Sequence, residues 1–109
     1  MTLRAAVFYE DRRAGTLAKT PDGFEFHYDP GYLAEPRAAP VSLALPLRPE
    51  KYASRSLFPF FEGLLPEGWL LEQACAASGI GRDEKLKLLL LVGRDPIGAV
   101  RVLAEARHG

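Results

Sequence analysis

"TLAKTPDGFEFHY", residues 16–28, holds two strand-like segments on either side of a strong turn signal. In the turn, Pro21 presets its backbone angle, Asp22 can form a local hydrogen bond and Gly23 accepts a positive φ. After the turn, aromatic positions alternate with polar ones, which is the period of a strand with one buried face. The side chains expected to face inward are Phe24, Phe26 and Tyr28. His27 lies between them and is therefore expected on the solvent side, with no catalytic role.

Further strands are predicted before this hairpin and at the end of the chain. Residues 3–10 show a period of two, and "EDRRAG", residues 10–15, is expected to form a turn in which Arg12 and Arg13 are solvated. "GAVRVLAEA" is expected to rejoin the sheet as a strand through Val100 and Val102. The sequence thus predicts an antiparallel meander completed by a C-terminal strand.

The segment from Asp29 to Lys51 contains five prolines, which exclude long regular elements. Apolar residues recur throughout it, so an ordered loop is expected. "VSLAL" is interpreted as a short edge strand with three side chains on one face: Val41, Leu43 and Leu45.

Two helices are predicted around the middle of the chain. The first, "LFPFFEGLL" at 57–65, has Ser56 as its candidate cap and a proline in its first turn. The second, "PEGWLLEQACAASG" at 66–79, is expected to begin at Pro66 and to end at Gly79.

A third helix is predicted from "DEKLKLLLLVG", residues 83–93, with Asp83 as its cap and Gly93 as its stop. The side chains expected to face inward are Leu86, Leu89 and Leu90. Strands followed by helices indicate an α+β fold, with a small antiparallel sheet packed against two to three short helices. All 109 residues are expected to form a single domain, 1–109.

Composition excludes several classes of function. Fourteen basic and fourteen acidic residues give no net charge, which argues against nucleic acid as the main ligand. Cys75 is the only cysteine, so no disulfide framework is expected, and its side chain is predicted to be a small buried hydrophobe. His27 and His108 are the only histidines, so a metal site is not expected. The apolar run 88–92 is too short to cross a bilayer, and a cytoplasmic location is the default expectation.

No catalytic or cofactor-binding residues are predicted. "VGRDPIGAV" lacks the glycine spacing of a phosphate-binding loop, and Val100 stands where a kinase catalytic loop would need asparagine. A tight turn is expected there, with Arg94 and Asp95 fixing it and Gly98 allowing close packing. Nowhere does the sequence assemble a nucleophile, a base and an orienting group, so the protein is not expected to be an enzyme.

"FPFFEGLLPEGW", residues 58–69, is rich in aromatic and apolar side chains that prolines and glycines interrupt. Most of them are expected to fill the core. Trp69, however, follows a glycine at the start of a helix and is predicted to face a partner protein, because tryptophan is enriched among interface hot spots. The complete predicted partner-binding set is Phe61, Glu62, Leu65, Pro66, Glu67 and Trp69.

Several motifs together resemble the small N-terminal subdomain of HipA-type serine/threonine kinases. These motifs are "FEFHYDPGYL", "VSLALPL", "FFEGLLPEG" and "LLVGRDPIGAV", and the resemblance covers residues from about Leu3 to Val102. Gly63 departs from the family pattern, which often has asparagine there. The ATP-binding and catalytic part of such kinases is absent from the sequence, so the chain resembles HipS, the free-standing form of this subdomain in three-gene HipBST toxin–antitoxin systems.

That resemblance implies a partner and a role. It implies binding to a HipT-type or HipA-type kinase and neutralisation of that kinase, alongside a DNA-binding HipB-type protein in a ternary complex. Three alternatives stay open: a non-catalytic subunit that completes or supports a split kinase, an N-terminal piece of a full HipA, and an orphan domain that serves as an adaptor to a HipB-type protein. The resemblance does not fix the sign of regulation.

Overall fold

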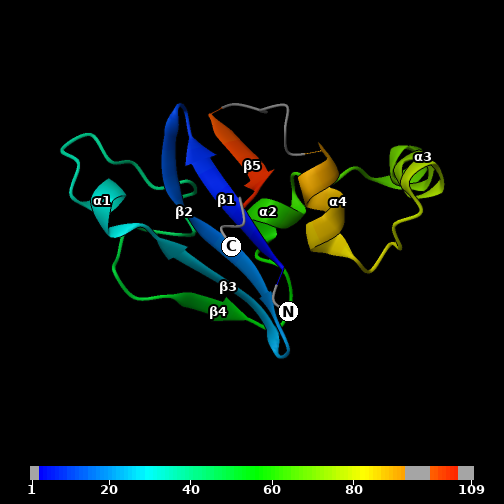
Figure 1. Ribbon diagram of the computed structural model, residues 1–109, viewed down its shortest axis with the longest axis horizontal. Helices are drawn as coiled ribbons and strands as arrows, with labels where there is room; N and C mark the ends of the chain where they lie inside the picture. Colours follow the sequence, from blue (N-terminus) through cyan, green and yellow to red (C-terminus); the bar gives the residue numbers. More distant parts are fainter. Residues whose placement is uncertain (1–2, 93–98, 106–109) are drawn as a thin grey trace.

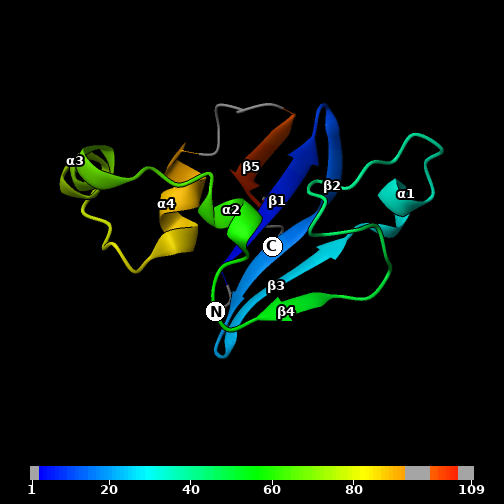
Figure 2. The same cartoon turned by 180° about the vertical axis from the view of Figure 1, so that it is seen from behind.

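The computed structural model describes residues 3–92 and 99–105, which form a five-stranded antiparallel sheet and four helices (Figures 1 and 2). The strands are β1 (Arg4–Tyr9), β2 (Arg12–Thr20), β3 (Gly23–Tyr28), β4 (Tyr52–Ser54) and β5 (Val100–Ala104). The helices are α1 (Pro30–Leu33), α2 (Pro59–Glu62), α3 (Gly68–Ser78) and α4 (Lys85–Val92). The strand order is β4-β3-β2-β1-β5, and α2 and α4 pack on one face of the sheet. The predicted α+β fold, with its meander and returning C-terminal strand, is confirmed.

Both hairpins of the meander turn through only two residues. Thr20 pairs with Gly23, so Pro21 and Asp22 form the predicted turn, and Gly23 has a φ of 149°. A Cβ at Gly23 would collide with the backbone carbonyl of Ser54 in the neighbouring strand. Glycine is therefore needed at the end of this turn for both its backbone angle and its lack of a side chain.

The first turn is shorter than predicted. Glu10 and Asp11 alone form it, with Glu10 at a φ of 56°, and Arg12 pairs with Tyr9 as the first residue of β2. The prediction of a solvated arginine turn is therefore wrong. Arg13 pairs with a strand residue too, because β1–β2 pairing continues past a bulge to the very end of the hairpin.

Arg13 joins three parts of the sheet on the face opposite the helices. Its guanidinium lies 3.4 Å from the Asp29 carboxylate, donates to the Thr16 hydroxyl at 2.8 Å and lies 3.1 Å from the Glu105 carboxylate. Glu105 also lies 3.4 Å from the Arg4 guanidinium. These groups link β2 to the ends of β3 and β5.

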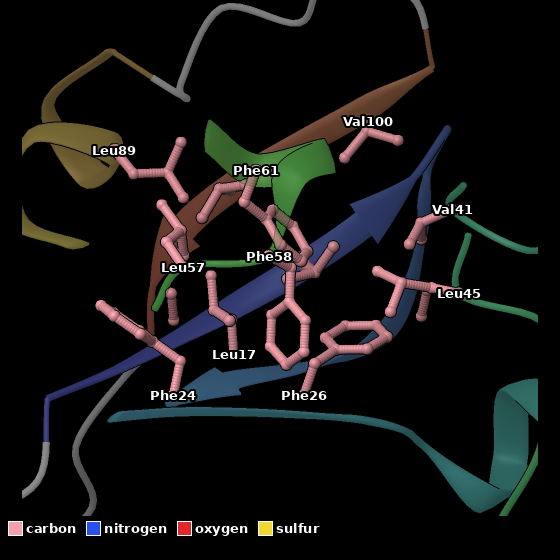
Figure 3. Close-up of a cluster of buried hydrophobic side chains, with 14 of the residues drawn as sticks. Leu17, Phe24, Phe26, Val41, Leu45, Leu57, Phe58, Phe61, Leu89 and Val100 are labelled. Carbon is pink, nitrogen blue, oxygen red and sulfur yellow. The ribbon is translucent and has the colours of Figure 1, made fainter. Parts of the chain in front are cut away.

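The core lies between the sheet and the two helices that cover it (Figure 3). Aromatic rings from β3 and α2 meet at its centre, with the Phe26 and Phe61 centroids 5.6 Å apart. The predicted inward positions of β3 and β5 are buried, and His27 is half-buried on the other face. Leu86 and Leu89 are buried and Leu90 packs half-buried against the core, as the helical pattern predicted.

Two tyrosine hydroxyls hold the proline-containing loop against this core. Tyr28 donates to the Leu45 carbonyl and accepts the Val41 N–H at 3.0 Å. Tyr32 both donates to and accepts from the backbone of Ala39. Burial raises the pKa of Tyr28 to about 12, because an ionised phenolate loses its hydration there.

The loop itself is ordered as expected, but "VSLAL" is not a strand. The Leu45 N–H bonds to the Ser42 carbonyl and closes a turn, which leaves Leu43 95% exposed while Val41 and Leu45 point into the core. The edge strand is instead β4, which the sequence pattern missed.

All three predicted helices begin later in the structure than predicted, and α2 also ends earlier, at Glu62 and not at Leu65. Phe58, and not Ser56, is the N-cap of α2, and no side chain caps that helix. The helix α3 begins at Gly68, two residues after Pro66, and ends as predicted with Gly79 in the left-handed conformation. The helix α4 begins at Lys85, so Asp83 lies before its cap position.

Two other predictions concern single residues and the last turn. Cys75 is half-buried, not buried as predicted. The turn predicted with Gly93, Arg94, Asp95 and Gly98 lies outside the described residues.

Candidate partner-binding surface

Residues 66–84, hereafter the α3 arm, consist of α3 and the segments that connect it to α2 and α4. None of these residues is buried. Figures 1 and 2 both show α3 at one end of the molecule, beyond α4 and away from the sheet. The arm is therefore an ordered extension of the domain that contributes nothing to its buried core.

The exposed side chains of α3 are unusually apolar for a helix without a buried face. Trp69 is 68% exposed and Leu70 is 59% exposed. A short helix gains most of its stability by packing an apolar stripe against another element. No residue of α3 is buried, and on its least exposed side Leu71, Ala74 and Cys75 are only half-buried. Exposed apolar side chains on an ordered element are a common feature of surfaces that bind other molecules.

A pocket of about 270 Å³ lies at the base of the arm, between α3 and α4. Four of the six predicted partner-binding residues line it: Glu62, Leu65, Pro66 and Glu67. The remainder of its lining includes Leu71, Arg82, Lys85 and Leu88. The structure thus brings most of the predicted set together around one cavity, close in sequence to Trp69.

Two ion pairs border the pocket. The Lys85 ammonium lies 2.9 Å from the Glu62 carboxylate, and the Arg82 guanidinium lies 2.7 Å from the Glu72 carboxylate. All four side chains are more than a third exposed, so each pair contributes little to stability. Each pair places one acidic and one basic side chain together beside the pocket, so their charges compensate each other.

The prediction that Phe61 contacts a partner is wrong. Its side chain is fully buried and packs against Phe26, Phe58 and Phe60, so it offers no surface to a partner. In a one-turn helix two adjacent aromatic residues point in different directions, and Phe61 is the one that points to the sheet. Phe60 is half-buried at the edge of the core.

Sequence reasoning missed several residues of this surface. Leu70 and Leu71 are not among the predicted partner-binding residues, because helical periodicity alone does not reveal which side of a helix its own domain leaves exposed. Lys85 reaches Glu62 across 23 residues of sequence, and no local pattern signals such a pairing.

A second, larger hollow of about 530 Å³ lies between the β2–β3 turn and the start of α4. Its charged side chains include Lys19, Lys85 and Lys87 with Asp83 and Glu84. Residues 3–92 and 99–105 contain no group of three His, Cys, Asp or Glu side chains that could hold a metal ion. No helix within those ranges is long and apolar enough to span a membrane.

The fold defines a class of small α+β domains in which an ordered helix with exposed apolar side chains extends beyond the sheet. Comparison with known families makes the classification specific. Residues 5–103 match the family described as the HipA N-terminal domain, and the chain belongs to that family.

Individual relatives agree with this assignment. An uncharacterized protein of Haemophilus influenzae is 33% identical over 99 residues, which cover 91% of this chain and 90% of the relative. The Sinorhizobium fredii protein named "Putative kinase Y4mE" is 33% identical over 107 residues, which cover 96% of this chain but 26% of that protein. The solved structure titled "N-terminal domain of HipA toxin" superposes with a TM-score of 0.72 at 29% identity, covering 97% of this chain and 95% of that one.

Proposed function

We propose that this protein is an antitoxin-like protein that binds and neutralises a HipA-type or HipT-type serine/threonine kinase. The observation that carries the proposal is the α3 arm, an ordered helix with no buried residue that exposes Trp69 and Leu70. Membership of the HipA N-terminal domain family supports a kinase as the partner.

The energetics favour an arm that is completed by another protein. An exposed indole and an adjacent exposed leucine gain roughly 25 cal/mol for each Å² of apolar area that a partner removes from water. The arm is already folded as a helix, so binding does not need to order its backbone, and preformed surfaces bind at lower entropic cost. We infer that the kinase docks over α3, with a HipB-type protein completing a ternary complex in the cytoplasm.

A second candidate function is a non-catalytic subunit that completes a split kinase and supports its activity. One observation favours it: 96% of this chain matches 26% of a single protein named as a kinase, in which the matching domain is joined to a larger remainder. In that case the same surface would hold the kinase in its active arrangement. A piece of a full HipA would use the surface in the same intramolecular way.

A co-expression experiment separates these functions. A HipA-type kinase that lacks this domain, taken from the same genome, is induced with and without the protein, and growth is followed. Neutralisation predicts arrested growth with the kinase alone and restored growth with both. A supporting subunit predicts the reverse, with arrest only when both are present.

Purified components give the matching biochemical result. Autophosphorylation of the kinase should fall as the protein is titrated in if the protein neutralises it, and rise if the protein supports it. Absence of a complex between the two purified proteins would refute both functions. The protein alone and the kinase alone serve as controls for growth and for phosphate transfer.

A further inference from the structure

The Glu67 carboxylate has no partner among the residues that the structure describes. Glu67 is the N-cap residue of α3, with a φ of −125°, but its side chain makes no capping hydrogen bond. It is exposed, and it forms no ion pair with any other residue that the structure describes. An N-cap side chain ordinarily bonds to the first turn of its helix, so a free carboxylate at this position is available to a ligand.

The other charges around the pocket are already compensated. Glu62 pairs with Lys85 and Arg82 pairs with Glu72, which leaves Glu67 as the one charged side chain of the pocket lining without an ion pair to residues 3–92 or 99–105. The apolar part of the lining comes from Leu65, Pro66, Leu71 and Leu88. The pocket therefore combines an apolar wall with one free negative charge.

This combination fits a long cationic side chain. Lysine and arginine bury an aliphatic stem along apolar surface and keep a charged head at the edge. A purely apolar side chain in the pocket would instead take water away from the Glu67 carboxylate without giving it a partner, which costs free energy. An acidic side chain would place two like charges together.

We propose that the pocket receives an arginine or lysine side chain of the partner kinase, with its stem against Leu65 and Leu71 and its head paired with Glu67. The inference rests on the proposed function, because the kinase is the occupant. Recognition is then reciprocal, since Trp69 projects from the arm toward the partner while the pocket beside it receives a residue from the partner.

The test is a titration of the whole protein onto the full kinase. Glu67→Gln keeps the shape and removes the charge, and it should raise the Kd about tenfold or more at low salt. Glu67→Lys should raise the Kd further through repulsion, whereas Glu67→Asp should keep most of the affinity. The dependence of Kd on ionic strength should be weaker for Glu67→Gln than for the wild type, because one attractive charge pair has been lost.

Glu50→Gln is the matched control, since Glu50 is also exposed, lies two residues before β4 and outside the α3 arm, and its substitution should leave the Kd unchanged. Thermal unfolding of every variant confirms that the fold is intact. A Glu67→Gln Kd within twofold of the wild type, with an unchanged salt dependence, overturns the assignment of the pocket while the proposed function stands. If the wild-type protein itself does not bind the kinase, the proposed function fails and the pocket assignment fails with it.

Discussion

Replacing Trp69 by alanine should separate stability from binding. Trp69 is 68% exposed in the free protein, so its indole contributes little to the folded state, and alanine is the better helix former. A tryptophan buries about 150–250 Å² when fully covered. The exposed portion is thus on the order of 100–170 Å², and at about 25 cal/mol per Å² its removal from water is worth roughly 2.5–4 kcal/mol. Immobilising the side chain costs about 0.5–1.5 kcal/mol, which leaves a net loss of about 1–3.5 kcal/mol in binding free energy; the middle of that range, about 2 kcal/mol, is roughly thirtyfold in Kd.

The assay pairs thermal unfolding of the free Trp69→Ala variant with calorimetric titration onto the kinase. Leu43→Ala is the control, because Leu43 is 95% exposed and lies in the proline-containing loop, outside the α3 arm. Both variants should unfold at the wild-type temperature, and only Trp69→Ala should bind weakly and fail to neutralise the kinase in cells. A folded Trp69→Ala variant with the wild-type Kd would place the interface elsewhere on the surface.

Three further predictions concern the core and the sheet. Leu89→Ala should lower the free energy of unfolding by about 2–5 kcal/mol, because Leu89 is buried. Leu91→Ala, at a 44% exposed position of the same helix, should lower it by less than about 1 kcal/mol. Urea denaturation measures both values, and equal losses would contradict the assigned helix face. Because burial raises the pKa of Tyr28 from 10.0 to about 12, its contribution to stability should be complete below pH 10 and should be lost as the pH rises toward 12. Tyr28→Phe should therefore show a smaller decline than the wild type in denaturation curves recorded across that window, and identical declines would refute the linkage. Gly15→Ala should destabilise by about 1–3 kcal/mol, because its Cβ would collide with a backbone carbonyl of β3, while Gly31→Ala, with open space around it, should be close to neutral in the same assay.

Most of the fold follows from local signals in the sequence. The Pro21–Asp22 turn and the alternation on either side of it specify the β2–β3 hairpin without reference to the remainder of the chain. Gly79 has the left-handed φ that ends α3 where the sequence predicted. In each case the information lies within a few residues of the feature.

The failures have a physical explanation as well. "VSLAL" has the composition of a strand, but its Val41 N–H and its Leu45 carbonyl form hydrogen bonds with the Tyr28 hydroxyl. This contact with a residue more than ten positions earlier in the sequence overrides the local strand preference. Arg13 was assigned to a turn because its partners, Asp29 and Glu105, are distant in sequence.

The candidate site was predictable only where a local sequence signal exists. A tryptophan after a glycine at a helix start indicated an exposed side chain, and Trp69 is exposed. The adjacent phenylalanines, Phe60 and Phe61, could not be told apart, because only the sheet beneath them decides which one is buried. The pocket forms because α4 lies beside α3. The periodicity of either helix cannot predict this tertiary contact.

The pairing of β5 with β1 has a kinetic consequence. Ala5 pairs with Ala104, so this pairing closes a loop that contains almost the whole chain, whereas the β1–β2 and β2–β3 hairpins close over two residues. Loop closure becomes entropically more costly with length, and long-range pairing slows folding. We expect the three-stranded meander to form early and β5 to dock late, so that substitutions in β5 accelerate unfolding while substitutions in the Pro21–Asp22 turn slow folding. The α3 arm lies inside the long loop, between β4 and β5, and the protein should therefore acquire its capacity to bind a partner only in the final step of folding.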